Sequence, residues 1–139
     1  MEHHLRKATK TAHFYSLGNI SNDITDLWIC CHGYGQNAED FLKDFECIQA
    51  EERLIISPEG LSRFYWGGFH GPIASSWMTS KDRLIEIEDY CNWLDQLYSE
   101  IVPQLSPNLR ITLAGFSQGT ATVMRWVHAR QPKIQRILL

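Results

Sequence analysis

The sequence predicts an α/β domain in which helices cover both faces of a mostly parallel sheet. Three apolar runs have the length of strands buried on both faces, and they span residues 27–31, 53–57 and 109–114. Glycine or proline follows each run within two residues and would stop the strand. Segments with helical spacing separate the runs, which favours parallel pairing because parallel strands need a long crossover connection. We expect the 139 residues to belong to a single domain.

The N-terminal residues predict an antiparallel hairpin at one edge of this sheet. Two extended stretches, residues 3–8 and 11–17, flank a short lysine-containing link. Turn-forming residues 18–23 follow and separate the hairpin from the first buried strand.

A helix is expected soon after the first buried strand. Asn37 is a good N-cap residue, and the acidic side chains of Glu39 and Asp40 lie in the first turn, beside the positive end of the helix. Phe41 and Phe45 are four residues apart, which places both on one face.

Residues 61–78 predict a long loop after the second buried strand. The segment is rich in glycine and in aromatic residues, which are Phe64, Tyr65, Trp66, Phe69 and Trp77. Long loops inside compact domains are often functional. Two interpretations stay open: a functional loop, or aromatic side chains that only cover the edge of the sheet.

Two further helices complete the pattern. Thr79 and Asp82 resemble a capping box, and apolar residues then recur at spacings of three and four through residues 84–101. Another helix is expected after the strand at 109–114 and extends to about Ala129, because Pro132 cannot continue it.

The main functional motif is Gly-Phe-Ser-Gln-Gly at residues 115–119, which fits the pattern G-x-S-x-G. In this pattern a strand turns so sharply into a helix that the serine is held in a strained conformation and its neighbours must lack side chains. Here the motif directly follows a buried strand and directly opens a helix, whose positive end would face developing negative charge. We therefore predict that Ser117 is a catalytic nucleophile.

The turn His-Gly-Tyr-Gly at residues 32–35 predicts the second half of such a site. Hydrolysis through a serine needs two backbone N–H groups for the oxyanion, one after the nucleophile and one from a loop after an earlier strand. Gln118 and Tyr34 fit these two positions, and Gly33 and Gly35 would let the loop approach closely. Without the serine motif, an ordinary glycine turn would explain these residues as well.

These motifs resemble the phospholipase/carboxylesterase family of α/β-hydrolases, which includes acyl-protein thioesterases and lysophospholipases. The resemblance rests on Gly-Phe-Ser-Gln-Gly, on His-Gly-Tyr-Gly-Gln and on Ser-Pro-Glu-Gly at residues 57–60, and it covers essentially the whole chain. It implies an α/β-hydrolase-type sheet and hydrolysis of carboxylic esters or thioesters through a Ser117 acyl-enzyme. It also implies an oxyanion hole from the amides of Tyr34 and Gln118, no metal or organic cofactor, and a structural role for His32.

Two positions depart from the family pattern. Gln36 stands where small members commonly carry an acid, and Ala-Ser-Ser-Trp-Met at residues 74–78 stands where many have a Trp-Phe-Asp segment. The resemblance therefore leaves the acyl chain and the leaving group open.

The triad acid and base are expected outside these residues. In α/β-hydrolases they follow the nucleophile in the order Ser, Asp, His, so the resemblance implies that both lie beyond Leu139 and that the domain is C-terminally incomplete, with strands missing.

The histidines within the chain are poor candidates for the base. His128 would lie about 16 Å along the helix from Ser117 at roughly 1.5 Å per residue, and the histidines of residues 3–13 belong to the predicted hairpin. Only His32 and His70 could come near Ser117, and a base also needs hydrogen-bond reach and an orienting partner.

Composition and charge exclude other classes of protein. The chain is 44% hydrophobic and 21% charged, which is typical of a folded globular protein. Its net charge of −3 and its scattered basic residues disfavour nucleic acid as a partner. No apolar run reaches the roughly 18 residues that span a bilayer, and the N-terminus lacks the core of a signal peptide, so we expect a cytoplasmic protein. The four cysteines indicate reduced, mostly buried thiols.

A second class of function stays open, together with one expectation about assembly. A non-catalytic hydrolase-like module could bind an acyl or aromatic ligand through residues 61–78; an Asp and then a His beyond Leu139 would favour the enzyme. Residues 134–139 are expected to pair beside the strand at 109–114 as an open, apolar edge, which favours self-association.

Overall fold

A five-stranded, mostly parallel sheet forms the centre of the computed structural model, which describes residues 1–139. The strands are β1 (Phe14–Leu17), β2 (Asp26–Cys31), β3 (Arg53–Pro58), β6 (Arg110–Gly115) and β7 (Arg136–Leu138). Their order across the sheet is β1-β3-β2-β6-β7, and only β1 runs antiparallel to its neighbour. This sheet confirms the predicted fold class and the three predicted buried strands.

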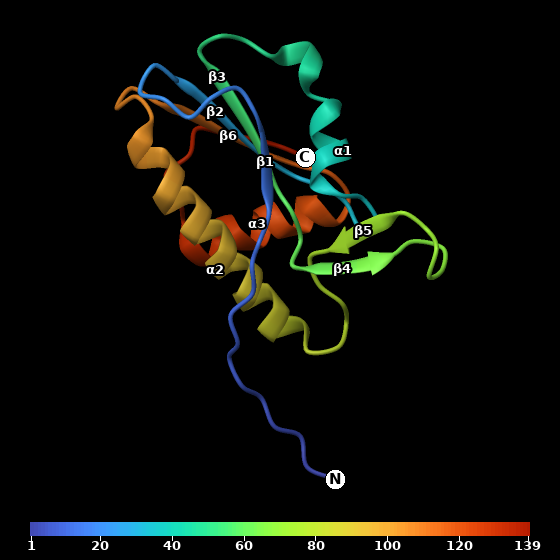
Figure 1. Ribbon diagram of the computed structural model, residues 1–139. Helices are drawn as coiled ribbons and strands as arrows, with labels where there is room; N and C mark the ends of the chain where they lie inside the picture. Colours follow the sequence, from blue (N-terminus) through green and yellow to red (C-terminus); the bar gives the residue numbers. More distant parts are fainter.

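Helices cover both faces of the sheet (Figure 1). Helix α1 (Ala38–Lys43) lies on one face, and α2 (Arg83–Ile101) and α3 (Gln118–Arg130) pack on the other. Short 3-10 turns follow α1 and α2 at Glu46–Ile48 and Val102–Gln104. None of these helices has the length and apolarity that crossing a bilayer would require.

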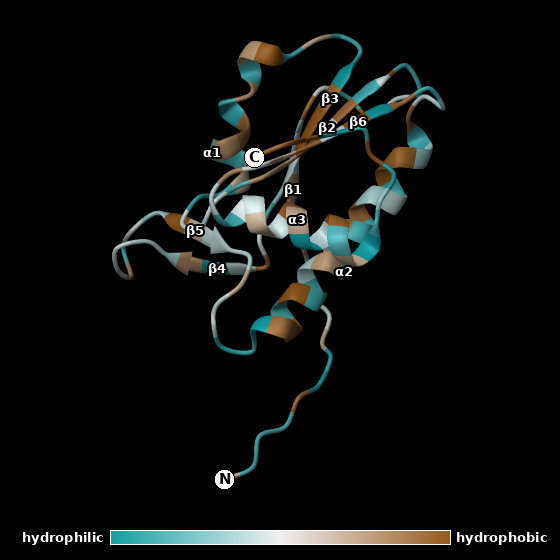
Figure 2. Cartoon of the chain, turned by 180° about the vertical axis from the view of Figure 1, so that it is seen from behind, coloured by the Kyte–Doolittle hydropathy of each residue, from teal (hydrophilic) through white to brown (hydrophobic).

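Strand β2 shows why the central strands are continuous apolar runs. Leu27 and Ile29 contribute to the large core under α2 and α3, whereas Cys30 contributes to the smaller core under α1. Successive side chains of a strand point to opposite faces, so burial on both faces requires apolar residues at every position. Figure 2 shows this as largely brown central strands, whereas the helices alternate between brown and teal.

Helix α1 begins as the sequence predicts. The side chain of Asn37 accepts a hydrogen bond from the backbone N–H of Asp40 at 2.7 Å, which satisfies one of the free amides at the helix start. The rings of Phe41 and Phe45 meet edge to face with centroids 5.3 Å apart.

The predicted N-terminal hairpin is wrong in its pairing. Residues 11–17 do contain the edge strand β1, but residues 3–8 form no strand and are exposed. Instead β1 pairs with β3, with Phe14 opposite Pro58. Figure 1 shows the residues before β1 running past α2, where Lys7 pairs with Asp89 at 3.2 Å, and ending as an extended tail. The extended pattern of residues 3–8 had no buried partner to pair with, because these residues are mostly polar or charged.

The predicted loop at residues 61–78 is also corrected, because it contains the antiparallel hairpin of the structure. Strands β4 (Ser62–Tyr65) and β5 (Ile73–Ser76) pair in register from Ser62 opposite Ser76 to Tyr65 opposite Ile73. Gly67 and Gly68 both adopt positive φ, which allows the chain to reverse between the strands.

The capping box predicted at Thr79 does not form. Helix α2 starts at Arg83, and its N-cap Asp82 is left-handed without a side-chain cap. The hydroxyl and the backbone N–H of Thr79 instead donate to Glu86 at 3.1 and 2.7 Å. Thr79 therefore ties the preceding segment to the helix rather than capping it.

Strand β7 forms one edge of the sheet, beside β6, with Thr112 opposite Arg136. Leu138 is 47% exposed there.

We predict that the isolated chain self-associates through the β7 edge, because β7 offers unpaired backbone groups and apolar side chains to another copy. Sedimentation over a range of concentrations tests this. Leu138→Lys should shift the equilibrium toward monomer, whereas a wild-type chain that stays monomeric throughout would contradict the prediction.

Candidate active site

Ser117 occupies the sharp turn between β6 and α3. Its backbone has φ 54° and ψ −118°, and the residue is exposed. A positive φ costs a residue with a side chain on the order of 1–3 kcal/mol, and such strain is found mainly where function requires it. The next residue, Gln118, is the first of helix α3, so the serine lies at the positive end of that helix.

Two glycines make this turn possible. A Cβ atom on Gly115 would lie 2.6 Å from the carbonyl oxygen of Gly119. A Cβ atom on Gly119 would overlap the carbonyl oxygen of Cys31 and lie 2.6 Å from that of His32. The G-x-S-x-G pattern thus reflects the close approach of the start of α3 to the end of β2.

The His-Gly-Tyr-Gly turn lies directly against the serine. A Cβ atom on Gly33 would be 3.1 Å from the Cβ of Ser117 and 3.2 Å from a ring carbon of Phe116. The backbone N–H of Phe116 donates to the carbonyl of Cys31 at 3.1 Å, which joins the two turns just before their central residues. The sequence segments around residues 33 and 117 therefore meet at the carboxyl ends of β2 and β6, as predicted.

His32 is fully buried, and both of its ring nitrogens are occupied. The backbone N–H of Gly60 donates to Nε2 at 3.0 Å, so Nε2 is the acceptor and Nδ1 carries the proton. Nδ1 then donates to the carbonyl oxygen of Gly33 at 2.7 Å. With no free nitrogen and no exposed surface, His32 is not available as a base for Ser117.

The hydrogen bond from His32 orients the peptide between Gly33 and Tyr34. The Gly33 carbonyl and the Tyr34 N–H belong to one planar trans peptide, so fixing one fixes the other in the opposite direction. The Gly33 carbonyl also accepts from the backbone N–H of Gln36 at 3.3 Å, while the Gln36 side chain accepts from the Gly33 N–H at 2.7 Å. Gln36 thus supplies an uncharged acceptor that holds the turn.

The two amides predicted for the oxyanion hole have no acceptor within the chain. The Tyr34 N–H makes no hydrogen bond to backbone or side chain, although its neighbours at Gly33, Gly35 and Gln36 all do. The Gln118 N–H precedes the ladder of α3, so no helix carbonyl lies before it to accept. One unpaired amide follows the exposed serine directly and the other belongs to the turn that lies against it, and two such amides can bind an anionic oxygen.

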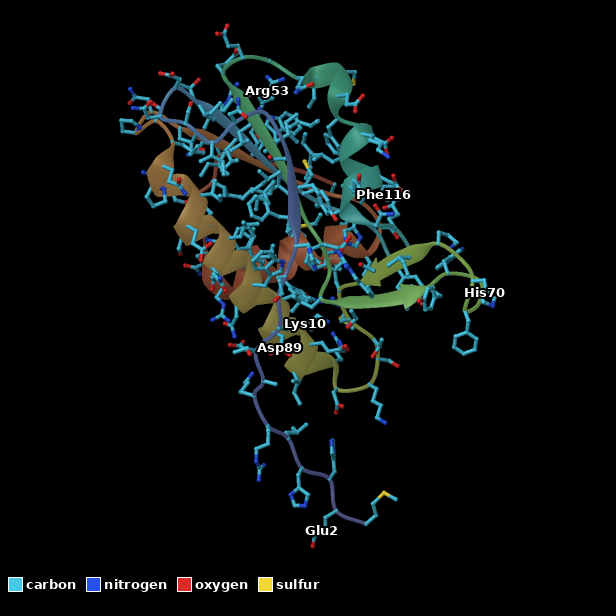
Figure 3. The ribbon with its side chains drawn as sticks, in the orientation of Figure 1. Glu2, Lys10, Arg53, His70, Asp89 and Phe116 are labelled. Atoms are coloured by element: carbon cyan, nitrogen blue, oxygen red, sulfur yellow. The ribbon has the colours of Figure 1, made fainter.

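The other nucleophile and base candidates lie elsewhere. Figure 3 shows His70 at the far end of the β4–β5 hairpin. No hydrogen bond joins the Ser117 hydroxyl to a histidine, because those of His32 go to Gly33 and Gly60. Burial raises the pKa of the Cys31 thiol to about 12, which keeps it protonated. No group of three His, Cys, Asp or Glu side chains is placed to hold a metal ion.

An aromatic cluster lies beside the His-Gly-Tyr-Gly turn. The rings of Tyr34 and Phe64 stack with centroids 5.2 Å apart, and Trp66 meets Tyr34 edge to face at 5.8 Å. The Trp66 ring also rests on the backbone of Gly35, where a Cβ atom would overlap the ring. Tyr34 and Trp66 remain about half exposed, at 51% and 48%. Tyr34 and the hairpin aromatics therefore form a partly open apolar wall beside the His-Gly-Tyr-Gly turn.

Sequence reasoning missed three polar side chains that hold this region together. Glu59 is buried, accepts from the N–H of Ala38 at 3.4 Å and pairs with Arg63 at 2.7 Å. The side chains of Gln36 and Gln118 make further contacts with the backbone. The only sequence signal for Glu59, Gln36 and Gln118 was that each belongs to one of the three motifs at residues 57–60, 32–36 and 115–119.

The buried His32 predicts a pH dependence of stability. Burial lowers the pKa of His32, and this outweighs the opposing effects of its bond to Gly33 and of the Glu59 charge. The ordinary pKa of histidine is 6.5, and below that pH His32 of the unfolded chain binds a proton that the buried His32 of the folded chain does not accept. The free energy of unfolding should therefore fall as the pH drops below 6.5. Urea unfolding measured above and below this pH tests it. His32→Gln should flatten the dependence, and an unchanged slope would contradict the assignment.

Comparison with known proteins supports the fold. No family model and no curated protein matches the chain. Among solved structures, esterase PE8 has a TM-score of 0.62 at 19% identity and matches 92% of this chain and 62% of its own. A phospholipase/carboxylesterase from Dyadobacter fermentans has a TM-score of 0.62 at 18% identity and matches 96% of this chain and 64% of its own. Zea mays acyl-protein thioesterase 2 has a TM-score of 0.55 at 18% identity, with 81% and 49% matched.

These neighbours show that the chain has the α/β-hydrolase-type fold, and they are of the kinds that the sequence motifs resemble. The chain spans about half to two thirds of the length of each of the three.

Proposed function

We propose that the chain carries the nucleophile and the oxyanion hole of a serine hydrolase that cleaves carboxylic esters or thioesters. Ser117 is the nucleophile, and the amides of Tyr34 and Gln118 bind the oxyanion. The observation that carries this proposal is an exposed serine at positive φ between two amides that have no acceptor. This backbone arrangement is the one expected of a nucleophile elbow.

The proposed chemistry follows from these atoms. The Ser117 hydroxyl attacks the carbonyl carbon of the ester, and the negative charge that develops on the carbonyl oxygen is stabilised by the two N–H groups and by the start of α3. The tetrahedral intermediate releases the alcohol or thiol and leaves an acyl-serine, which water then hydrolyses. Proton transfer in both steps needs an acid–base pair that these 139 residues do not supply to Ser117.

The substrate class rests on two supports. The structural neighbours are named as an esterase, a phospholipase/carboxylesterase and an acyl-protein thioesterase. The aromatic wall of Tyr34, Phe64 and Trp66 would contact an apolar part of a small ester or thioester. The proposal includes no metal or organic cofactor, and it places the protein in the cytoplasm.

A second candidate is a non-catalytic module that binds an acyl or aromatic ligand. The same aromatic wall favours it, because half-exposed rings beside a turn can hold an apolar ligand without any reaction at Ser117. The two candidates differ in whether Ser117 reacts.

Covalent labelling tests the catalytic proposal. We expect a reactive fluorophosphonate, incubated with the chain for hours, to modify Ser117 and add one adduct to the intact mass, because the phosphoryl oxygen fits between the two free amides. Peptide mapping should find Ser80 and Ser99 unmodified although both are exposed. Ser117→Ala should abolish the adduct. Equal labelling of the variant, or of all exposed serines, would refute the proposal and leave the binding module.

A further inference from the structure

The side chain of Gln118 joins the start of α3 to the segment that follows β5. Its carbonyl oxygen accepts from the backbone N–H of Trp77 at 2.9 Å, and its amide nitrogen donates to the carbonyl of Met78 at 2.8 Å. The same nitrogen lies 3.5 Å from the Ser76 hydroxyl. The Gln118 amide therefore pairs with two consecutive residues of this segment in the way that a neighbouring strand would.

The indole of Trp77 joins the same segment to the other turn of the site. Its Nε1–H donates to the carbonyl oxygen of His32 at 2.8 Å, and its ring packs against the His32 ring with centroids 5.2 Å apart. Tyr90 of α2 meets the Trp77 ring edge to face, with centroids 6.0 Å apart. Trp77 is only 2% exposed, so these contacts hold it in a single position.

The segment Ser76–Met78 thus contacts both turns that meet at Ser117. On one side it holds Gln118, whose own N–H is a proposed oxyanion donor. On the other side it holds His32, which fixes the peptide that carries the Tyr34 N–H. The backbone bond from Phe116 to Cys31 joins the turns only at their base.

We propose that Ser76–Met78 is a positioning brace that sets the spacing of the two oxyanion amides, with Trp77 and the side chain of Gln118 as its two attachments. The inference rests on the proposed function, which it deepens. Neither attachment touches a reacting atom, so Trp77 acts through His32 and the Gln118 side chain acts through the start of α3. Loss of either hydrogen bond lets one amide drift from the position that the oxyanion requires.

The test uses a matched pair of tryptophan variants. Trp77→Phe keeps an aromatic ring but removes the N–H that binds the His32 carbonyl. Trp93→Phe makes the same change at a buried tryptophan whose Nε1–H has no partner. We expect Trp77→Phe to slow fluorophosphonate labelling of Ser117 by about tenfold, as the loss of roughly one buried hydrogen bond in the adduct would. Trp93→Phe should label at the wild-type rate.

Two spectroscopic readouts separate positioning from general stability. The ³¹P shift of the Ser117 adduct reports hydrogen bonds to the phosphoryl oxygen, and it should move in Trp77→Phe but not in Trp93→Phe. In the unlabelled chain, the ¹⁵N shift of the Tyr34 amide should change in Trp77→Phe and should stay at the wild-type value in Trp93→Phe. Unchanged shifts together with an unchanged labelling rate would overturn the brace.

The outcomes also separate the brace from the proposed function. If the probe never modifies Ser117 of the wild-type chain, the proposed function is refuted, while the amide shifts still test the brace. Gln118→Met serves as a second variant, and we expect it to move the Tyr34 amide far less than the Trp77 and Met78 amides. If neither variant folds, hydrogen exchange of the wild-type Trp77 indole decides: slow exchange is expected, and exchange at the rate of free indole would overturn the proposal.

Discussion

The isolated chain is expected to hydrolyse a short activated aryl ester no more than about 10³–10⁴-fold faster than water alone does. A complete serine triad would exceed this by a factor on the order of 10⁶. The reason is that Ser117 has no base: His32 has both nitrogens engaged, and His70 lies at the end of the hairpin. An unactivated hydroxyl is a weak nucleophile, so only the oxyanion hole and substrate binding would accelerate the reaction.

Ser117→Ala is the control for this expectation. Because triad residues act as a unit, removing the serine from a chain that lacks the base should change the steady-state rate little. Rapid turnover that Ser117→Ala abolishes would show that the chain does contain a base. His70→Ala and His32→Ala would then identify it, with His32→Ala interpreted only after its folding has been checked.

The sequence was sufficient for the buried strands and for the contact between the two motifs. Residues 27–31 are apolar at every position because both faces are covered, and this needs no knowledge of the partner strands. The glycines at 115 and 119 mark a backbone approach that allows no side chain. Since carboxyl ends of parallel strands lie at the same edge of a sheet, the placement of Ser117 near Gly33 followed.

The edges of the fold were less predictable for a physical reason. Residues 3–8 and 61–78 carry local signals for extension or for turns, but pairing depends on which strand has free backbone groups nearby. Strand β1 pairs with β3, and the aromatic-rich residues 61–78 fold back on themselves to form the paired strands β4 and β5. Phe64 and Trp66 pack on the turn of Tyr34 rather than on the sheet edge alone. Neither interpretation of residues 61–78, as a functional loop or as a cover for the sheet edge, described this packing in full.

Side-chain hydrogen bonds within the site could not be predicted at all. The tautomer of His32 is set by the N–H of Gly60, which is 28 residues away, and the Gln118 side chain reaches Met78 across 40 residues. Such contacts arise only after the sheet and the hairpin are assembled. The family resemblance implied a structural role for His32, but the orientation of the Tyr34 peptide emerges only from the distances.

Gly119→Ala is expected to destabilise the domain by about 3 kcal/mol or more, a large effect for the addition of one methyl group. In an open helix this change would stabilise by about 1 kcal/mol, because alanine favours helix more than glycine does. Here the added Cβ would meet the carbonyl oxygens of Cys31 and His32, which are backbone atoms at the end of a central strand and cannot rotate away. Helix α3 would have to move off β2.

Urea unfolding of Gly119→Ala beside Gly67→Ala tests this. Nothing lies within 4 Å of a Cβ at Gly67, but its φ of +75° is unfavourable for alanine, so that variant should lose only about 1 kcal/mol through backbone strain. A displaced α3 would also carry the Gln118 amide away from Tyr34, so Gly119→Ala should lose labelling at Ser117 even where it remains folded. A Gly119→Ala chain as stable as the wild type would mean that α3 and β2 lie farther apart than the structure places them, and the paired amides would then no longer support an oxyanion hole.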